Sequence, residues 1–244
     1  MTKEYHQRDH VTRKGRVLYT SKKSDRLDEE RGREVWTLTR HADGRRSLMS
    51  HGEIDDRPSV LRFVHVTANA DWAPIDAFVR ITVGDAFRGS GWFRFADGIA
   101  ECETYTALEG RVSQRFPYSG ACPGFGGHAI QNDGWVCASV DLDKPGQPQT
   151  FTQLVSSTDH RGATGPYIAE ARPTVIYVGD EKIEVGAGTF DAHHFQFVAV
   201  EGLPQEHPIY NVWTTTDGDY IFLKGQVDGY MQTYYELVEL SDGL

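Results

Sequence analysis

Apolar and polar residues alternate along most of this chain, and the alternation is most regular in its last third. Six runs rich in Val, Ile, Tyr, Phe, Thr and Trp follow one another at residues 174–178, 182–185, 189–200, 209–216, 220–224 and 230–240. Short Gly- and Asp-containing segments such as Asp217-Gly218 and Asp228-Gly229 separate them. β-forming runs interrupted about every ten residues by such turn signals predict an antiparallel meander. No stretch keeps the helical period of about 3.6 residues.

The first part of the chain repeats this pattern. A hairpin is predicted around the Asp43-Gly44 turn and another around Asp97-Gly98. Single strands are predicted at 17–19, 60–66 and 75–83, so that six or seven strands precede residue 110.

Residues 111–172 form a long irregular segment that is rich in Gly and Pro. Long irregular segments in a compact domain are usually functional loops or lids. We therefore predict an all-β fold, in which an antiparallel meander forms a lipocalin-like barrel or half-barrels. Residues 1–244 would make one domain, with possible halves at 34–110 and 173–240 joined by the loop-rich segment.

Composition narrows the range of partners. Of the 244 residues 39% are apolar and 11% aromatic, which suits a curved sheet around an aromatic-lined interior. The formal net charge is −10, and no basic block is long enough to follow a phosphate backbone. We therefore expect neither nucleic acid nor a membrane surface as a partner.

The cysteines and the N-terminus indicate a location. Cys102, Cys122 and Cys137 form no CxxC pair, and the first residues contain no apolar signal-peptide core. No run of about 18 apolar residues is present for a membrane span. The expectation is a cytoplasmic protein with reduced thiols.

Three segments near the C-terminus carry a family resemblance: residues 188–195 with Gly-x-Phe-Asp, residues 212–218 with Trp followed by Asp-Gly, and the final strand 235–240. Together they resemble uncharacterised bacterial half-barrel proteins similar to the LolA/LolB-type lipoprotein carriers. The resemblance implies a curved antiparallel sheet that holds an apolar ligand. It transfers no catalytic residue, and lipocalin-like enzymes are similar by architecture only.

The glycine-rich segment 120–135 is the first candidate for chemistry. It contains His128, Asp133 and Trp135 among glycines that allow a ligand to approach the backbone closely. His128 and Asp133, five residues apart, would act as a general acid or base with an orienting carboxylate. In the alternative, His128 only hydrogen-bonds a loop carbonyl.

The second candidate is the run 191–197. Alternation on a strand places His193 and Phe195 on one face and His194 on the other. If the aromatic face lines the interior, burial would keep His193 neutral and able to act as a base. A purely structural histidine is the alternative.

Further residues are candidates for substrate binding. Arg80 lies on the strand face opposite an aliphatic face, so it either faces solvent or grips a carboxylate or carbonyl. Tyr105, Tyr210 and Trp213 either pack across strands or line a pocket. No pair of the ten histidines has metal-ligand spacing, so we expect no metal and no organic cofactor.

Three functional hypotheses follow. The first is a cofactor-independent lyase, hydratase/dehydratase or isomerase for a small hydrophobic compound, aromatic or terpenoid-like. His128, Asp133 and His193 would be its catalytic residues, and its pocket would be formed by Arg80, Tyr105, Trp135, Phe195, Tyr210 and Trp213. The second is a non-catalytic carrier or sensor of a small hydrophobic molecule. The third is an assembly module whose exposed sheet edge pairs with a partner, including a homo-oligomer.

Overall fold

The computed structural model describes residues 9–243 and is dominated by antiparallel strands. The first meander contains eight of them: β1 (His10–Ser21), β2 (Glu30–His41), β3 (Arg46–Ile54), β4 (Val60–Ala68), β5 (Pro74–Val83), β6 (Ala86–Ala96), β7 (Ile99–Thr106) and β8 (Gly110–Pro117). Seven strands thus begin before residue 110, as predicted. The first of them is longer than the three residues expected for it.

The central segment contains short elements, and a second meander follows it. The short elements are β9 (Gly124–Gly126), the helix α1 (Ile130–Val136), a 3-10 turn (Cys137–Ser139), β10 (Pro148–Thr150) and β11 (Gln153–Val155). The second meander is β12 (Ala169–Val185), β13 (Gly188–Glu201), β14 (Tyr210–Thr215), β15 (Phe222–Val227) and β16 (Thr233–Asp242). Among residues 9–243, no helix is both long and apolar enough to cross a bilayer.

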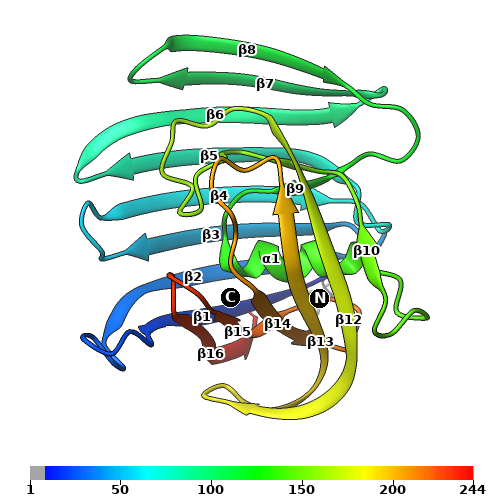
Figure 1. Cartoon of the computed structure of the whole chain (residues 1–244). Helices are drawn as coiled ribbons and strands as arrows, with labels where there is room; N and C mark the ends of the chain where they lie inside the picture. Colours follow the sequence, from blue (N-terminus) through cyan, green and yellow to red (C-terminus); the bar gives the residue numbers. More distant parts are fainter. Residues whose placement is uncertain (1–8, 244) are drawn as a thin grey trace, which may run out of the picture.

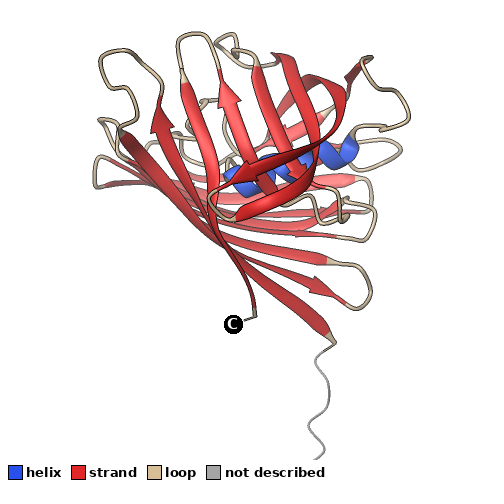
Figure 2. Cartoon of the chain, turned by 90° about the horizontal axis from the view of Figure 1, so that it is seen from below, coloured by secondary structure: helices blue, strands red, loops and turns tan. Residues whose placement is uncertain are grey.

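All sixteen strands belong to one sheet, with the order β8-β7-β6-β5-β4-β3-β2-β1-β16-β15-β14-β13-β12-β11-β9 and with β10 beside β12. Strand β1 pairs with β2 on one side and with β16 on the other, so it connects the two meanders. The all-β antiparallel meander predicted from the alternation is therefore confirmed. The sheet curves around α1, which crosses its concave side (Figures 1 and 2).

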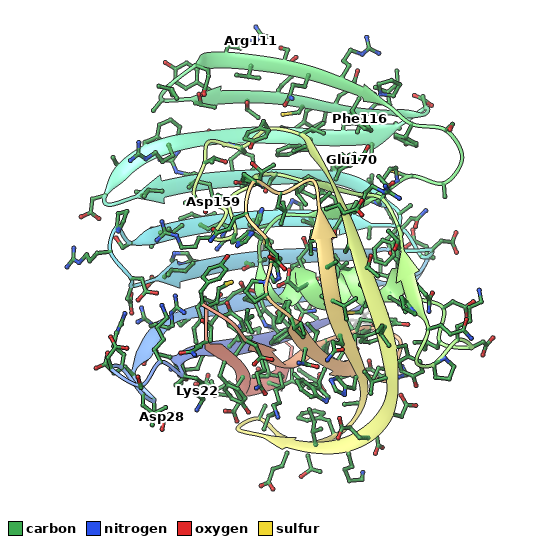
Figure 3. The ribbon with its side chains drawn as sticks, in the orientation of Figure 1. Lys22, Asp28, Arg111, Phe116, Asp159 and Glu170 are labelled. Carbon is green, nitrogen blue, oxygen red and sulfur yellow. The ribbon has the colours of Figure 1, made fainter. Side chains whose placement is uncertain are left out.

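The alternation determines which side chains reach the interior. On β4, Val60, Val64 and Val66 are buried, whereas Phe63 is 42% exposed on the other face. The buried apolar residues of successive strands form one core around α1. At the outer edge β8 carries charged residues such as Arg111, labelled in Figure 3, which discourage pairing with another chain.

Turn signals were interpreted correctly in one place and wrongly in another. Asp97 and Gly98 have φ angles of 55° and 74°, as a two-residue hairpin turn between β6 and β7 requires. Gly179-Asp180, by contrast, makes no turn. Strand β12 continues through it for 17 residues, with a shift of register against β13 between Tyr177 and Gly179. A glycine within a β-forming run marks a bulge as readily as a turn.

Candidate functional site

A cavity of about 80 Å³ lies between α1, the inner face of the first meander and the strands β14–β16. Most of the side chains that line it are titratable, in contrast to the apolar core around it. Those lining it are Tyr19, Arg31, Arg62, His128, Asp133, His160, Arg161, His207, Tyr210 and Tyr235. Ile54, Ile130, Val227, Met231 and Thr233 complete the lining.

Glu34 of β2 fixes the start of α1 beside this cavity. Its carboxylate accepts hydrogen bonds from the backbone N–H groups of Ile130 (2.7 Å) and Gln131 (3.0 Å), and from the Tyr19 hydroxyl (3.2 Å). The first N–H groups of a helix have no partner within it, so a buried carboxylate satisfies them. Burial raises the pKa of Glu34, although both backbone hydrogen bonds act in the opposite direction.

The side chain of Gln131 fixes α1 from the other side. It donates to the Tyr220 carbonyl (3.2 Å) and accepts from the Phe222 N–H (3.0 Å) at the start of β15. Helix α1 is therefore held between the two meanders by polar side chains, and it presents Asp133 to the cavity.

Asp133 is a buried carboxyl group at the site with a strongly altered acidity. Burial, together with the charge of Glu34, raises its pKa to about 7. The Tyr210 hydroxyl donates to its Oδ2 at 3.2 Å. Burial also raises the pKa of Tyr210 well above its usual value, so this hydroxyl keeps its proton. The carboxyl group of Asp133 can thus take up and release a proton near neutral pH.

His128 lies in the loop before α1 and is neutral at pH 7. Burial, reinforced by the nearby charge of Arg62, lowers its pKa to about 4. Its Nε2 is 2.9 Å from the Ser157 carbonyl oxygen. Because a carbonyl can only accept, Nε2 carries the proton and Nδ1 carries the free lone pair. The backbone of His128 has a φ of 61°, a left-handed conformation that non-glycine residues seldom adopt.

Arg62 of β4 points to the inner face and is only 5% exposed. Within residues 9–243, its guanidinium forms neither a hydrogen bond nor an ion pair with another residue. The charges of Glu34 and Asp133 are close enough for Arg62 to lower the pKa of both carboxyl groups. Arginine remains charged in proteins, so the cavity contains a fixed positive charge.

The structure brings three of the sequence-predicted site residues together: His128, Asp133 and Tyr210 all line the cavity. His128 and Asp133 do not hydrogen-bond each other, because His128 donates to the Ser157 carbonyl and Asp133 accepts from Tyr210. The orienting carboxylate expected for His128 is therefore absent from the described part of the chain. The roles proposed for these residues stay predictions.

His193 belongs to a different cluster. Its Nδ1 hydrogen-bonds the Asp180 carboxylate, and its ring packs near Tyr177, Phe195 and Tyr220. It shares a face of β13 with Phe195, as alternation predicts. His194 points to the other face and stacks on Trp213 of the neighbouring strand β14. His193 does not line the cavity, so the structure places it apart from His128 and Asp133.

Arg80 and Tyr105 were predicted to line a substrate pocket, but both lie on the outer face of the sheet. Arg80 is exposed and its guanidinium packs 4.8 Å from the centre of the Phe87 ring. Tyr105 is 60% exposed. The aliphatic face of β5 points inward, so residues that alternate with it point to solvent.

The remaining three predicted pocket residues are buried but do not line the cavity. Phe195 is fully buried in the core. The indole N–H of Trp213 donates to Glu181 at 2.7 Å, and Lys224 lies over its ring. Trp135 packs edge-on against Trp72 next to a separate space of about 20 Å³.

Sequence reasoning missed Glu34 and Arg62, although a signal was present. Each lies in phase with buried apolar residues, Glu34 with Trp36 and Leu38, and Arg62 with Val60 and Val64. A charged residue on the apolar face of an alternating strand is rarely accidental, because burying a charge is expensive. That pattern identifies both residues.

The histidines fall into separate places. His51 lies on the outer face stacked on Phe63, and His193 and His194 point to opposite faces of β13, whereas His128, His160 and His207 line the cavity. Within the described range 9–243, no group of three or more His, Cys, Asp or Glu residues could hold a metal ion. Cys102, Cys122 and Cys137 are free thiols.

Comparison with known proteins supports the fold and not an activity. No protein-family model matches the chain, and no curated protein does. A β-barrel-like protein of the domain of unknown function DUF1849 from Brucella abortus is similar in structure, with a TM-score of 0.59 and 12% identity over 96% of this chain and 98% of that one. A DUF1089 family protein from Pseudomonas aeruginosa covers 82% of this chain and 91% of its own, with 12% identity and a TM-score of only 0.40. The chain therefore has a fold found in bacterial β-barrel-like proteins, while a specific relation to the LolA/LolB-type carriers stays a prediction.

Proposed function

We propose that this protein is a non-catalytic carrier or sensor that binds one end of a small, largely hydrophobic molecule in the cavity beside α1. The observation that carries the proposal is the cavity itself, where hydrogen-bonding side chains replace apolar core. At about 80 Å³ it can hold a functional group but not a whole terpenoid, since drug-sized ligands occupy pockets of roughly 300–1,000 Å³. The volume of the cavity therefore restricts the part of the ligand that can enter it to a single functional group.

The apolar part of such a molecule has a place nearby. A groove of about 790 Å³ lies between the ends of β6–β8 and the segment that precedes β12, which includes Asp159 (labelled in Figure 3). Apolar residues on this groove include Val83, Leu108, Val112, Ala163 and Tyr167. Arg161 lines both the groove and the cavity, so the two spaces adjoin at this residue.

The test is to fill the cavity and ask whether a bound molecule is lost. Native mass spectrometry of the full-length protein would detect a small molecule that co-purifies with the wild type. Ile54→Phe places a ring at the cavity, whereas Ile183→Phe changes another half-buried strand isoleucine away from it. We expect loss of the added mass in Ile54→Phe only. A ligand retained by both variants contradicts the proposal.

Catalysis is a second candidate, favoured by the opposite pKa shifts of Asp133 and His128. With a pKa of about 7, Asp133 can take up and release a proton near neutral pH, whereas His128, with a pKa of about 4, stays neutral and offers the Nδ1 lone pair as a hydrogen-bond acceptor. A lyase or isomerase acting by proton transfer can use a group such as Asp133 as its acid or base. If the co-purifying molecule is converted by the wild type and not by Asp133→Asn, catalysis is supported, and recovery of the molecule unchanged favours the carrier.

A further inference from the structure

We propose that the cavity is a receptor for a single anionic group, a carboxylate or a phosphate, which pairs with Arg62. This inference rests on the proposed function, since it specifies the polar end of the ligand.

The first argument is that Arg62 has no partner of its own. Buried charges in proteins are normally paired and hydrogen-bonded, because leaving one unpaired is strongly destabilising. Arg46 follows the rule: its side chain is 12% exposed and it contacts Asp219 at 3.2 Å and the Gly218 carbonyl at 3.0 Å. Arg62 is buried more deeply than Arg46, yet no acceptor among residues 9–243 bonds to it.

The second argument is that the loop at Gly162 packs directly against the guanidinium, next to a cavity large enough for one small anion. A Cβ atom on Gly162 would lie 2.7 Å from Nη1 of Arg62 and 2.9 Å from Cβ of His128. Glycine therefore allows the backbone of this loop to lie directly against Arg62 and His128. The volume of about 80 Å³ accommodates a carboxylate or phosphate group, whose oxygens match the donor geometry of a guanidinium.

The third argument concerns the other groups that face the cavity. Burial raises the pKa of Tyr235 to about 12, and it raises that of Tyr19 and Tyr210 well above 10, so all three hydroxyls keep their protons. Tyr19 and Tyr210 already donate theirs to Glu34 and Asp133, which leaves the Tyr235 hydroxyl to donate to a bound anion. One carboxyl group lines the cavity, Asp133 from α1, and Glu34 of β2 lies outside the lining, at the start of the helix. Their negative charge opposes the entry of a second anionic group. Two further arginines, Arg31 and Arg161, and three histidines, His128, His160 and His207, line the other sides.

The experiment is a titration followed by amide NMR on the full-length protein in slightly acidic buffer of constant ionic strength. Acetate, inorganic phosphate and acetamide are the probes, acetamide being a neutral analogue of acetate. We expect saturable shifts of the Gly162 and Ile130 amides with acetate or phosphate and none with acetamide. The anion that binds with the lower dissociation constant identifies whether the ligand carries a carboxylate or a phosphate.

Variants assign the effect to Arg62. Arg62→Gln should weaken binding of the preferred anion at least about tenfold, which corresponds to about 1.4 kcal/mol, whereas Arg80→Gln on the outer face should change it less than about twofold. Equal responses to acetate and acetamide overturn the inference without any variant, even where Arg62→Gln folds poorly. Unchanged binding in a folded Arg62→Gln also overturns it.

The outcome separates this inference from the function on which it depends. If a neutral molecule co-purifies and is lost in Ile54→Phe while both anions fail to bind, the carrier proposal stands and the anion receptor is wrong. If the anions bind but nothing occupies the cavity of the protein as isolated from cells, the receptor stands and the carrier proposal is wrong.

Discussion

The residues that distinguish this protein are a few ionisable side chains on the concave face of an otherwise apolar sheet. Alternation predicted which strand positions point inward, and this rule includes Glu34 and Arg62. Sequence could not predict what each would contact. The hydrogen bonds that Glu34 accepts from α1 join residues 96 and 97 positions apart, and no local pattern encodes them.

Asp133 provides a test at this scale, because its folded pKa of about 7 exceeds the value of about 3.9 expected in the unfolded chain. The folded state therefore binds the Asp133 proton more tightly. The stabilisation that this bound proton gives the folded state is complete below about pH 4 and is lost as pH rises through about 7. Asp133→Asn resembles the protonated form at every pH. We expect it to exceed the wild type in unfolding free energy at about pH 8 by on the order of 1–3 kcal/mol, and to differ little near pH 4.

Urea unfolding at a series of pH values measures this difference. Asp143→Asn, at an exposed position after α1, is the control and should follow the wild-type curve. If the wild type and Asp133→Asn keep a constant separation across the pH range, Asp133 does not titrate in the manner inferred.

Among the elements, α1 decides where the cavity lies, and the sequence did not predict it. It has only seven residues, includes Gly134, and starts without a side-chain cap from the residue before it. An isolated helix of this length is unstable in water, so tertiary contacts must hold it. The strands were predictable because each carries its own period of two. Helix α1 was not, because Glu34 and Gln131 stabilise it through distant strands.

Glu34→Gln tests this account of α1. The carboxylate uses both oxygens to accept backbone N–H groups, whereas an amide replaces one oxygen with an NH₂ donor that would face a donor. We expect a loss of about 2–4 kcal/mol in unfolding free energy and faster hydrogen exchange at Ile130 and Gln131. Tyr19→Phe removes only the hydroxyl that donates to Glu34 and should lose about 1 kcal/mol. Similar losses in the two variants would show that Glu34 does not anchor the helix.

At the scale of the whole molecule, β1 makes two meanders into one sheet. The sequence indicated both meanders and the irregular segment between them, but not that the N-terminal strand would lie between β2 and β16. The pairing of β1 with β16 joins residues more than 200 positions apart, such as Arg16 and Glu239. Alternation defines a strand and its inward face but does not identify its neighbour, so this arrangement came only from the structure.

Since the sheet is continuous through β1, we predict that residues 1–244 unfold as one cooperative domain. Leu48 of β3 and Phe195 of β13 are fully buried, one in each meander. Leu48→Ala should lower the stability by about 2–5 kcal/mol and Phe195→Ala by about 3–5 kcal/mol. Calorimetry should show a single transition whose midpoint falls in both variants, because each cavity weakens the same cooperative unit. Two transitions, of which Leu48→Ala moves one and Phe195→Ala the other, would establish instead that the meanders fold independently and that β1 only links them.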